Sequence, residues 1–155
     1  MLKKMFRMTK AGADELRAEL DALIAGRALM AERIKTAREF GDLSENAEYQ
    51  SARADQDKSE ARITEIEHIL QNLEIIKEPN ASAATKVQLG STVKLKNDGK
   101  HKEFQIVGTV EADPLNGKIS DESPIGQLLM GKKVGEEVEI QTPAETSVYK
   151  IADIA

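Results

Sequence analysis

From Leu16 to Ala37 the chain reads LRAELDALIAGRALMAERIKTA, and mainly apolar residues recur in it at alternating steps of four and three. This series consists of Leu16, Leu20, Leu23, Arg27, Met30, Ile34 and Ala37. The heptad spacing predicts a long amphipathic helix whose apolar side is interrupted by one charge, that of Arg27. Thr9 is one of the residue types that favour the start of a helix, so we expect it to be the N-cap.

A second series with the same spacing follows residue 41 and predicts a second helix. It consists of Tyr49, Ala52, Gln56, Ser59, Ile63, Ile66, Leu70 and Leu73. The short connection around Gly41 is typical of an antiparallel helical hairpin. About 30 residues per helix, at a rise of 1.5 Å, make a rod on the order of 45 Å long. The series becomes small and polar toward the turn, so this end of the hairpin should be narrow.

The composition changes near residue 79. Residues 1–78 contain no proline and three glycines, whereas residues 79–155 contain all four prolines and the other seven glycines. We therefore expect a helical hairpin at 1–78 with its tip at 39–48, a linker at 79–85 and a second domain at 86–155.

The second domain has the pattern of a small α+β fold with an antiparallel sheet. Alternating apolar residues predict strands at 93–96, 104–107, 138–140 and 148–151. The first two strands flank Asn97-Asp98-Gly99, a typical hairpin turn. A short helix is expected between the two pairs, with Ser123 as N-cap, Pro124 in the first turn and Gly131 at the end.

Charge and composition exclude several classes of function. The chain has 22 Lys and Arg against 27 Asp and Glu, a net charge of −5, which argues against an autonomous, non-specific nucleic-acid binder. With five aromatic residues and no Trp, an aromatic-walled pocket is difficult to build. The absence of Cys excludes disulfides and thiolate metal sites. No segment has the pattern of a signal peptide or a membrane span, so we expect a soluble, cytoplasmic protein.

The connection between the two predicted helices is strongly acidic. Between residues 39 and 52 there are four acids and no Lys or Arg: Glu39, Asp42, Glu45 and Glu48. Asp42 and Glu45 have the spacing of a capping box, and their carboxylates could instead supply half of a Mg²⁺ site. Arg38 and Arg53 flank the acids and would by default be solvated helix charges. No Ser/His/Asp set, glycine-rich phosphate loop or His-Glu-x-x-His motif is present, so the chain offers no self-contained active site.

The run from Ala37 to Tyr49, AREFGDLSENAEY, followed by Ala52 and Arg53, closely resembles the tip of the Gre family of bacterial transcript-cleavage elongation factors. The opening segment Met8-Thr9-Lys10-Ala11-Gly12 resembles the start of that family. The segments Ser123-Pro124-Ile125-Gly126 and Leu129-Met130-Gly131-Lys132 resemble the signature of its C-terminal domain. The resemblance extends over nearly the whole chain, and the tip is more similar to the GreA branch than to the GreB branch.

The resemblance implies a division of labour between two domains. The C-terminal domain would be FKBP-like and would dock on the largest catalytic subunit of RNA polymerase, at the secondary channel, through Ser123, Pro124 and Ile125. The N-terminal coiled-coil hairpin would enter the channel. Asp42 and Glu45 would then help hold the second Mg²⁺ of the polymerase and position a water. A backtracked polymerase would hydrolyse its own transcript, and arrested elongation would resume.

The same resemblance implies that the chain is not itself an enzyme and has no cofactor of its own, since the Mg²⁺ belongs to the polymerase. Arg38 and Arg53 would face the extruded RNA. Contact with the RNA 3′ end and with DNA would occur only inside the elongation complex. We expect a monomer with no membrane partner.

Two alternative functions remain open from the residues. A non-cleaving relative could dock on the polymerase and block the channel, and the presence of both Asp42 and Glu45 is the feature that distinguishes a cleaving factor from it. A prolyl isomerase would need an aromatic pocket wall, whereas the C-terminal half contains only Phe104 and Tyr149.

Overall fold

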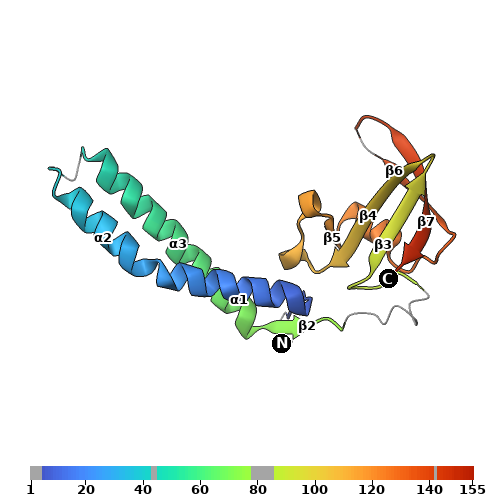
Figure 1. Cartoon of the computed structure of the whole chain (residues 1–155), viewed down its shortest axis with the longest axis horizontal. Helices are drawn as coiled ribbons and strands as arrows, with labels where there is room; N and C mark the ends of the chain where they lie inside the picture. Colours follow the sequence, from blue (N-terminus) through green and yellow to red (C-terminus); the bar gives the residue numbers. More distant parts are fainter. Residues whose placement is uncertain (1–4, 43–44, 78–85, 142) are drawn as a thin grey trace. The chain divides into compact units, whose positions relative to one another are not determined.

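The computed structural model describes residues 5–42, 45–77, 86–141 and 143–155 (Figure 1). These residues form two compact units. One unit is Ala13–Asn72, and the other combines the described residues up to Gly12 with those from Leu73 to Ala155. The described residues up to Gly12 thus belong with the C-terminal part. The expected division had placed them in the hairpin domain at 1–78, apart from the second domain at 86–155. The expected linker at 79–85 lies outside the described residues.

The helical part of the chain contains α1 (Lys10–Ala25), α2 (Arg27–Arg38) and α3 (Ala47–Gln71). Gly26 separates α1 from α2, but helical hydrogen bonding continues through it. Its N–H donates to the Ala22 carbonyl at 3.0 Å, and its own carbonyl accepts from the Met30 N–H at 3.1 Å. In Figure 1, α2 and α3 run side by side in opposite directions. The helical character of the N-terminal part is therefore confirmed, and the connection between α2 and α3 falls where the sequence predicts it.

The predicted heptad series faces inward. Ile34, Ala37, Ala52, Ile63 and Ile66 are all buried. The two buried positions nearest the connection are alanines, and the large buried isoleucines Ile63 and Ile66 lie farther along α3. Small side chains bury little apolar area, so the helices near their connection are held by a thin core.

Ion pairs between the helices accompany this thin core. Arg27, the charge that interrupts the series, donates to both carboxylate oxygens of Glu60 at 2.9 and 3.0 Å. Arg62 forms the same bidentate pair with Glu19, with hydrogen bonds of 2.7 and 2.9 Å. Hydrogen bonds from Arg62 hold the pKa of Glu19 below its usual value and raise the pKa of the Arg62 guanidinium. The Arg62–Glu19 pair is exposed and contributes at most about 1 kcal/mol.

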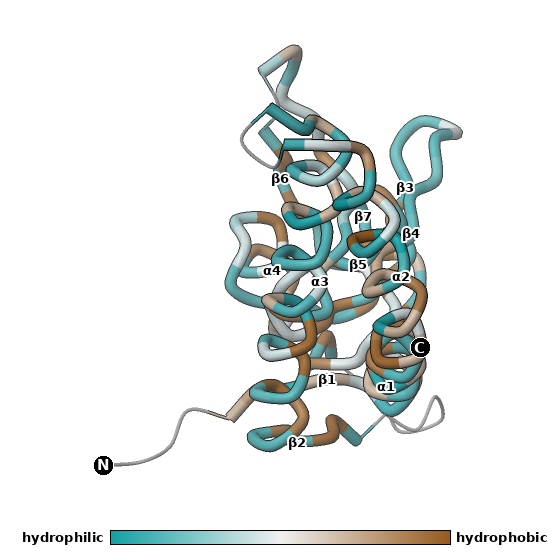
Figure 2. Tube along the Cα trace, turned by 90° about the vertical axis from the view of Figure 1, so that its left-hand side faces the viewer, coloured by the Kyte–Doolittle hydropathy of each residue, from teal (hydrophilic) through white to brown (hydrophobic). Residues whose placement is uncertain are grey.

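The C-terminal part is built on a five-stranded sheet in the order β5-β4-β3-β7-β6 (Figure 1). Its strands are β3 (Thr92–Asn97), β4 (Lys100–Val107), β5 (Lys118–Ser120), β6 (Glu137–Gln141) and β7 (Thr146–Ile154). The four predicted strands are confirmed as β3, β4, β6 and β7. The predicted hairpin turn is confirmed by positive φ at Asp98 (43°) and Gly99 (83°), as a type I′ turn requires. The β3–β4 hairpin is largely hydrophilic at this turn (Figure 2).

The four predicted strands pair antiparallel, as expected, and an unpredicted fifth strand makes the sheet mixed. β5 pairs with β4 in parallel, with Gln105 opposite Lys118. The chain reaches β5 from the end of β4 through two short 3₁₀ helices, η1 (Thr109–Glu111) and η2 (Pro114–Asn116). A strand of three residues shows too few positions for a period-two pattern, which is why the sequence did not reveal it.

One face of the sheet carries the core of this part. The core consists of Val87, Val93, Leu95, Ile106, Ile119, Leu129, Val138, Ile140, Tyr149, Ile151 and Ile154. The predicted helix is confirmed as α4 (Pro124–Leu129), which contributes the fully buried Leu129. No helix in the described ranges is long and apolar enough to cross a membrane.

A second, two-stranded sheet was not predicted. β1 (Phe6–Met8) pairs in parallel with β2 (Leu73–Ile75), where the sequence suggested a continuation of the second helix to Leu73. α3 ends at Gln71, and this pairing brings the start of the chain to the segment that follows α3.

The expected N-cap at Thr9 is confirmed, and Thr9 also joins the start of α1 to η1. Its hydroxyl accepts from the Gly12 N–H at 3.1 Å and donates to Oε2 of Glu111 at 2.7 Å. The Thr9 N–H donates to Oε1 of the same carboxylate at 2.7 Å. A Cβ on Gly12 would overlap the Glu111 carboxylate, so a larger residue at this position would have to displace that side chain.

Candidate functional site

The acidic tip lies in the connection between α2 and α3. α2 ends at Arg38, and α3 begins at Ala47. Asp42 and Glu45 are both exposed, and the Glu45 N–H donates to the Asp42 carbonyl at 3.4 Å. The expected carboxylate pair therefore lies in one turn that precedes α3. Leu43 and Ser44, between the two acids, are outside the described residues.

The N-cap of α3 is Asn46, so the expected capping role of Asp42 is wrong. The Asn46 side-chain oxygen accepts from the Tyr49 N–H at 3.1 Å. Its side-chain nitrogen donates to the Ala37 carbonyl, in the last turn of α2, at 2.6 Å. One side chain thus starts α3 and ties it to the end of α2. The sequence did signal this residue, because Asn is as good an N-cap as Asp, but the Asp42–Glu45 spacing favoured the earlier position.

The two expected arginines differ in their surroundings. The Arg38 guanidinium lies over the Tyr49 ring, 5.6 Å from its centre. This cation–π contact orients the Arg38 side chain. Arg53 is an exposed residue of α3. The structure therefore brings Arg38 to the base of the acidic turn.

The donor chemistry of the tip fits a hard cation in part. Carboxylate oxygens are preferred Mg²⁺ ligands, and Mg²⁺ requires a nearly octahedral set. Among the residues that the structure describes, no group of three or more His, Asp or Glu side chains could hold a metal ion. Asp42 and Glu45 can therefore supply part of a coordination shell, and the remaining ligands must come from elsewhere.

The second candidate region is the loop before α4. The Ser123 hydroxyl accepts from the Gly126 N–H at 3.1 Å and donates to the Ser120 carbonyl at 2.7 Å. Pro124 is exposed, whereas Ile125 is half-buried against the core. Of the three expected docking residues, Pro124 is thus the one presented to solvent. Ser123 shapes the loop, and Ile125 anchors it.

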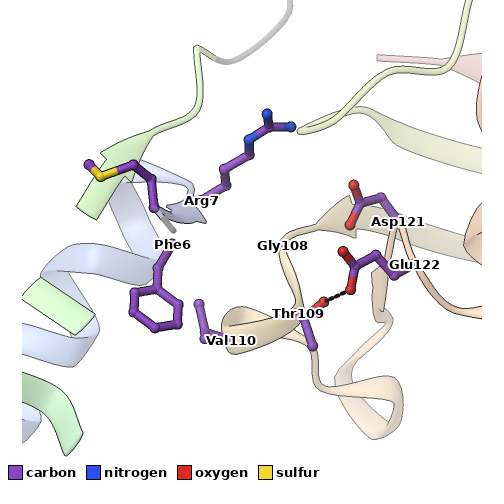
Figure 3. Close-up of a pocket in the computed structure, with 8 residues that line it drawn as sticks. Phe6, Arg7, Gly108, Thr109, Val110, Asp121 and Glu122 are labelled. Carbon is purple, nitrogen blue, oxygen red and sulfur yellow. Dashed lines mark hydrogen bonds between the residues drawn. The ribbon is translucent and has the colours of Figure 1, made fainter. Parts of the chain in front are cut away.

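A cavity of about 380 Å³ lies beside this loop (Figure 3). It is lined by Met5, Phe6, Arg7, Gly108, Thr109, Val110, Asp121 and Glu122. In Figure 3, charged side chains of opposite sign, Arg7 on one side and Asp121 and Glu122 on the other, border the cavity. The Thr109 hydroxyl holds Glu122 by donating to its Oε2 at 3.0 Å. The sequence did not indicate this cavity, because its two halves are separated by most of the chain.

Both parts of the chain match one protein family. Residues 6–75 match the family described as "Transcription elongation factor, N-terminal", and residues 82–155 match "Transcription elongation factor, GreA/GreB, C-term". A helical part with an acidic tip, joined to a sheet domain, is thus the architecture of a transcription elongation factor. The chain belongs to the GreA/GreB family.

Relatives called transcription elongation factor GreA match the chain over nearly its whole length. The protein from Bacillus licheniformis is 45% identical over 156 residues, which cover 99% of this chain and 98% of the relative. The protein from Bacillus subtilis (strain 168) is 46% identical with the same coverage. A solved structure of the transcription factor Gfh1 is 27% identical, with a TM-score of 0.48 and 99% coverage of both chains.

Proposed function

We propose that the protein binds RNA polymerase and stimulates the polymerase's own cleavage of backtracked transcripts. The C-terminal domain, which we take to be FKBP-like, docks on the largest catalytic subunit at the secondary channel. The helical part acts as a coiled-coil hairpin that reaches through the channel to the active centre. The protein acts as a cytoplasmic monomer, and it meets nucleic acid only inside the elongation complex.

The observation that carries this proposal is the placement of Asp42 and Glu45. Both acids are exposed in one turn between two helix ends, and Asn46 ties those ends together. The site is incomplete by itself, which suits a factor whose partner supplies the remaining ligands. The small buried residues Ala37 and Ala52 let the two helices lie close together behind the turn, as entry into a channel requires.

The chain's contribution to the reaction is to position charge. In a two-metal site, the bound ions activate the attacking water and stabilise the leaving oxygen. Asp42 and Glu45 add negative charge next to the more weakly held cation position, which favours its occupation. A carboxylate oxygen there can also accept a hydrogen bond from the attacking water and orient it. Arg38, oriented by Tyr49, is placed to pair with a phosphate of the extruded RNA.

The docking loop has separate tasks for its residues. Pro124 supplies exposed apolar contact, and Ser123 keeps the loop in shape through its two hydrogen bonds. Asp121 and Glu122, at the adjacent cavity, add negative charge that suits a basic partner surface.

The test is transcript cleavage in purified, backtracked elongation complexes. We expect Asp42→Ala and Glu45→Ala each to reduce the stimulated cleavage rate by about tenfold or more, because each removes a ligand of the reacting centre. Binding to the polymerase should be unchanged, since the docking loop is intact. Asp57→Ala, which removes an exposed acid within α3 and away from the turn, is the matched control and should cleave like the wild type.

Two results would contradict the proposal. Equal rates for the wild type and both tip variants would show that the acids take no part in cleavage. Binding of the wild type without any stimulated cleavage would instead support the non-cleaving relative that occludes the channel.

A further inference from the structure

Phe40 is unusual among the aromatic residues of this protein. All five aromatic residues lie in the described ranges, and Phe40 alone is exposed, at 74% of its surface. Its N–H donates to the Ala37 carbonyl at 3.2 Å, which places it in the turn that follows α2. The ring is therefore presented at the same end of the helical part as Asp42 and Glu45.

Phe40 lines a small groove that is bordered by charged side chains. The groove has a volume of about 300 Å³ and is lined by Leu29, Glu32, Arg33, Thr36, Ala37, Phe40 and Glu48. Its charged lining includes Arg33, which pairs with Asp55 at 2.6 Å. A protein-binding hot spot usually lies in a well-packed, fully desolvated pocket, whereas the apolar lining of this groove is one ring, one leucine and one alanine. The groove suits a single planar group better than the side of a helix or a strand.

Phe40 also stands between two residues of opposite charge. Arg38, Phe40 and Asp42 alternate along the chain as cation, aromatic ring and carboxylate. A nucleotide offers one complementary group for each of them. A phosphate is complementary to the cation, a flat uncharged base to the ring, and a cation bound at the reacting phosphate to the carboxylate. Glu39 and Glu48 would repel a phosphate placed on the ring itself, but they do not oppose a neutral base.

On the basis of the function proposed above, we propose that the Phe40 ring stacks on an unpaired base of the extruded transcript. The contact holds the nucleotide while its neighbouring phosphate lies at Asp42 and Glu45. Single-stranded RNA is commonly bound by stacking on aromatic side chains. Such stacking accepts every base, so it does not depend on the sequence of the transcript. Phe40 is thus a substrate-positioning residue.

The test compares two replacements of Phe40 with a control in the same groove. Phe40→Leu keeps an apolar side chain but removes the flat face, and Phe40→Tyr keeps the face. Leu29→Ala removes the other exposed apolar side chain, which is 77% exposed. The stimulated cleavage rate is measured against factor concentration, with RNA that carries either a normal or an abasic nucleotide at its 3′ end.

We expect Phe40→Leu to lower the maximal rate about tenfold on normal RNA, within the range that one lost stacking contact gives. The concentration for half-maximal rate should not change, because the docking loop is untouched. Phe40→Tyr and Leu29→Ala should behave like the wild type. On abasic RNA, the maximal cleavage rate of the wild type should equal that of Phe40→Leu, because neither protein then has a stacked base.

Several outcomes would overturn the stacking contact alone. One is a cleavage rate of Phe40→Leu that equals the wild-type rate while Asp42→Ala is inactive. Another is a cleavage rate of Phe40→Leu that lies below the wild-type rate by the same factor on normal and on abasic RNA. A raised half-maximal concentration with an unchanged maximal rate would assign Phe40 to a protein surface of the polymerase. Absence of cleavage with the wild type would overturn the proposed function and the stacking contact together.

Discussion

At the scale of single residues, Glu111 is a buried carboxylate with several partners. Its side chain is only 4% exposed, and both of its carboxylate oxygens accept hydrogen bonds from Thr9. The Lys118 ammonium lies 3.8 Å from Oε2. A buried carboxylate is tolerated only when it is paired in this way, so Glu111 fixes the start of α1 to η1.

We expect Glu111→Ala to lower the free energy of unfolding by about 2–4 kcal/mol, because it leaves the Thr9 N–H and hydroxyl without their buried partner. Urea denaturation followed by circular dichroism measures this change. Glu103→Ala, which removes an exposed acid of β4, should alter stability by less than about 0.5 kcal/mol. Equal stability of the wild type and Glu111→Ala would show that the carboxylate is not part of the buried network.

Asn46 is the corresponding residue at the tip. Asn46→Ala should cost about 1–2 kcal/mol, since it removes the cap of α3 and the bond to the Ala37 carbonyl. Asn46→Asp keeps the acceptor and loses the donor, so its stability should lie between those of the wild type and Asn46→Ala. The measurement is thermal unfolding at 222 nm, and a stability of Asn46→Asp as low as that of Asn46→Ala would mean that capping contributes nothing.

At the scale of elements, the sequence predicted the helices and the longer strands and missed the three shortest strands. The heptad series located the inward faces of the helices, because six or seven successive steps of three or four residues average out single exceptions such as Arg27. β1, β2 and β5 have three residues each, and their pairing depends on partners distant in the sequence. The cap at Asn46 was missed for a different reason, since two Asx residues competed within five positions.

The pair between Arg62 of α3 and Glu19 of α1 gives a pH-dependent prediction. The folded-state pKa of Glu19 is lowered. The contribution of this ion pair to the free energy of unfolding is therefore present above the unfolded-state pKa and is lost as the pH falls through the folded-state pKa. Glu19→Gln should therefore cost up to about 1 kcal/mol at neutral pH and less in acid, below about pH 4. Urea unfolding at both pH values measures the difference. A cost that is the same in acid, or that persists at high salt, would contradict an ionic contribution.

At the scale of the whole molecule, the two kinds of candidate residue are divided between the two compact units. The acids Asp42 and Glu45 belong to Ala13–Asn72, and the docking loop around Pro124 belongs to the other unit. The acidic tip and this loop could be predicted from the sequence, because each is continuous in the chain. The cavity between Arg7 and Glu122 could not, because only folding brings its two sides together.

Because the acids and the docking loop lie in different units, we expect that cleavage and polymerase binding, as proposed above, can each be lost without the other. The most direct measurement is the cleavage rate of a backtracked complex as a function of Mg²⁺ concentration, with the wild type, Asp42→Asn and Glu45→Gln. If the carboxylates help hold the weakly bound ion, both variants should need a higher Mg²⁺ concentration for half-maximal rate than the wild type, and excess Mg²⁺ should restore part of their activity. The same half-maximal Mg²⁺ concentration for all three proteins would contradict a role of Asp42 and Glu45 in holding this ion.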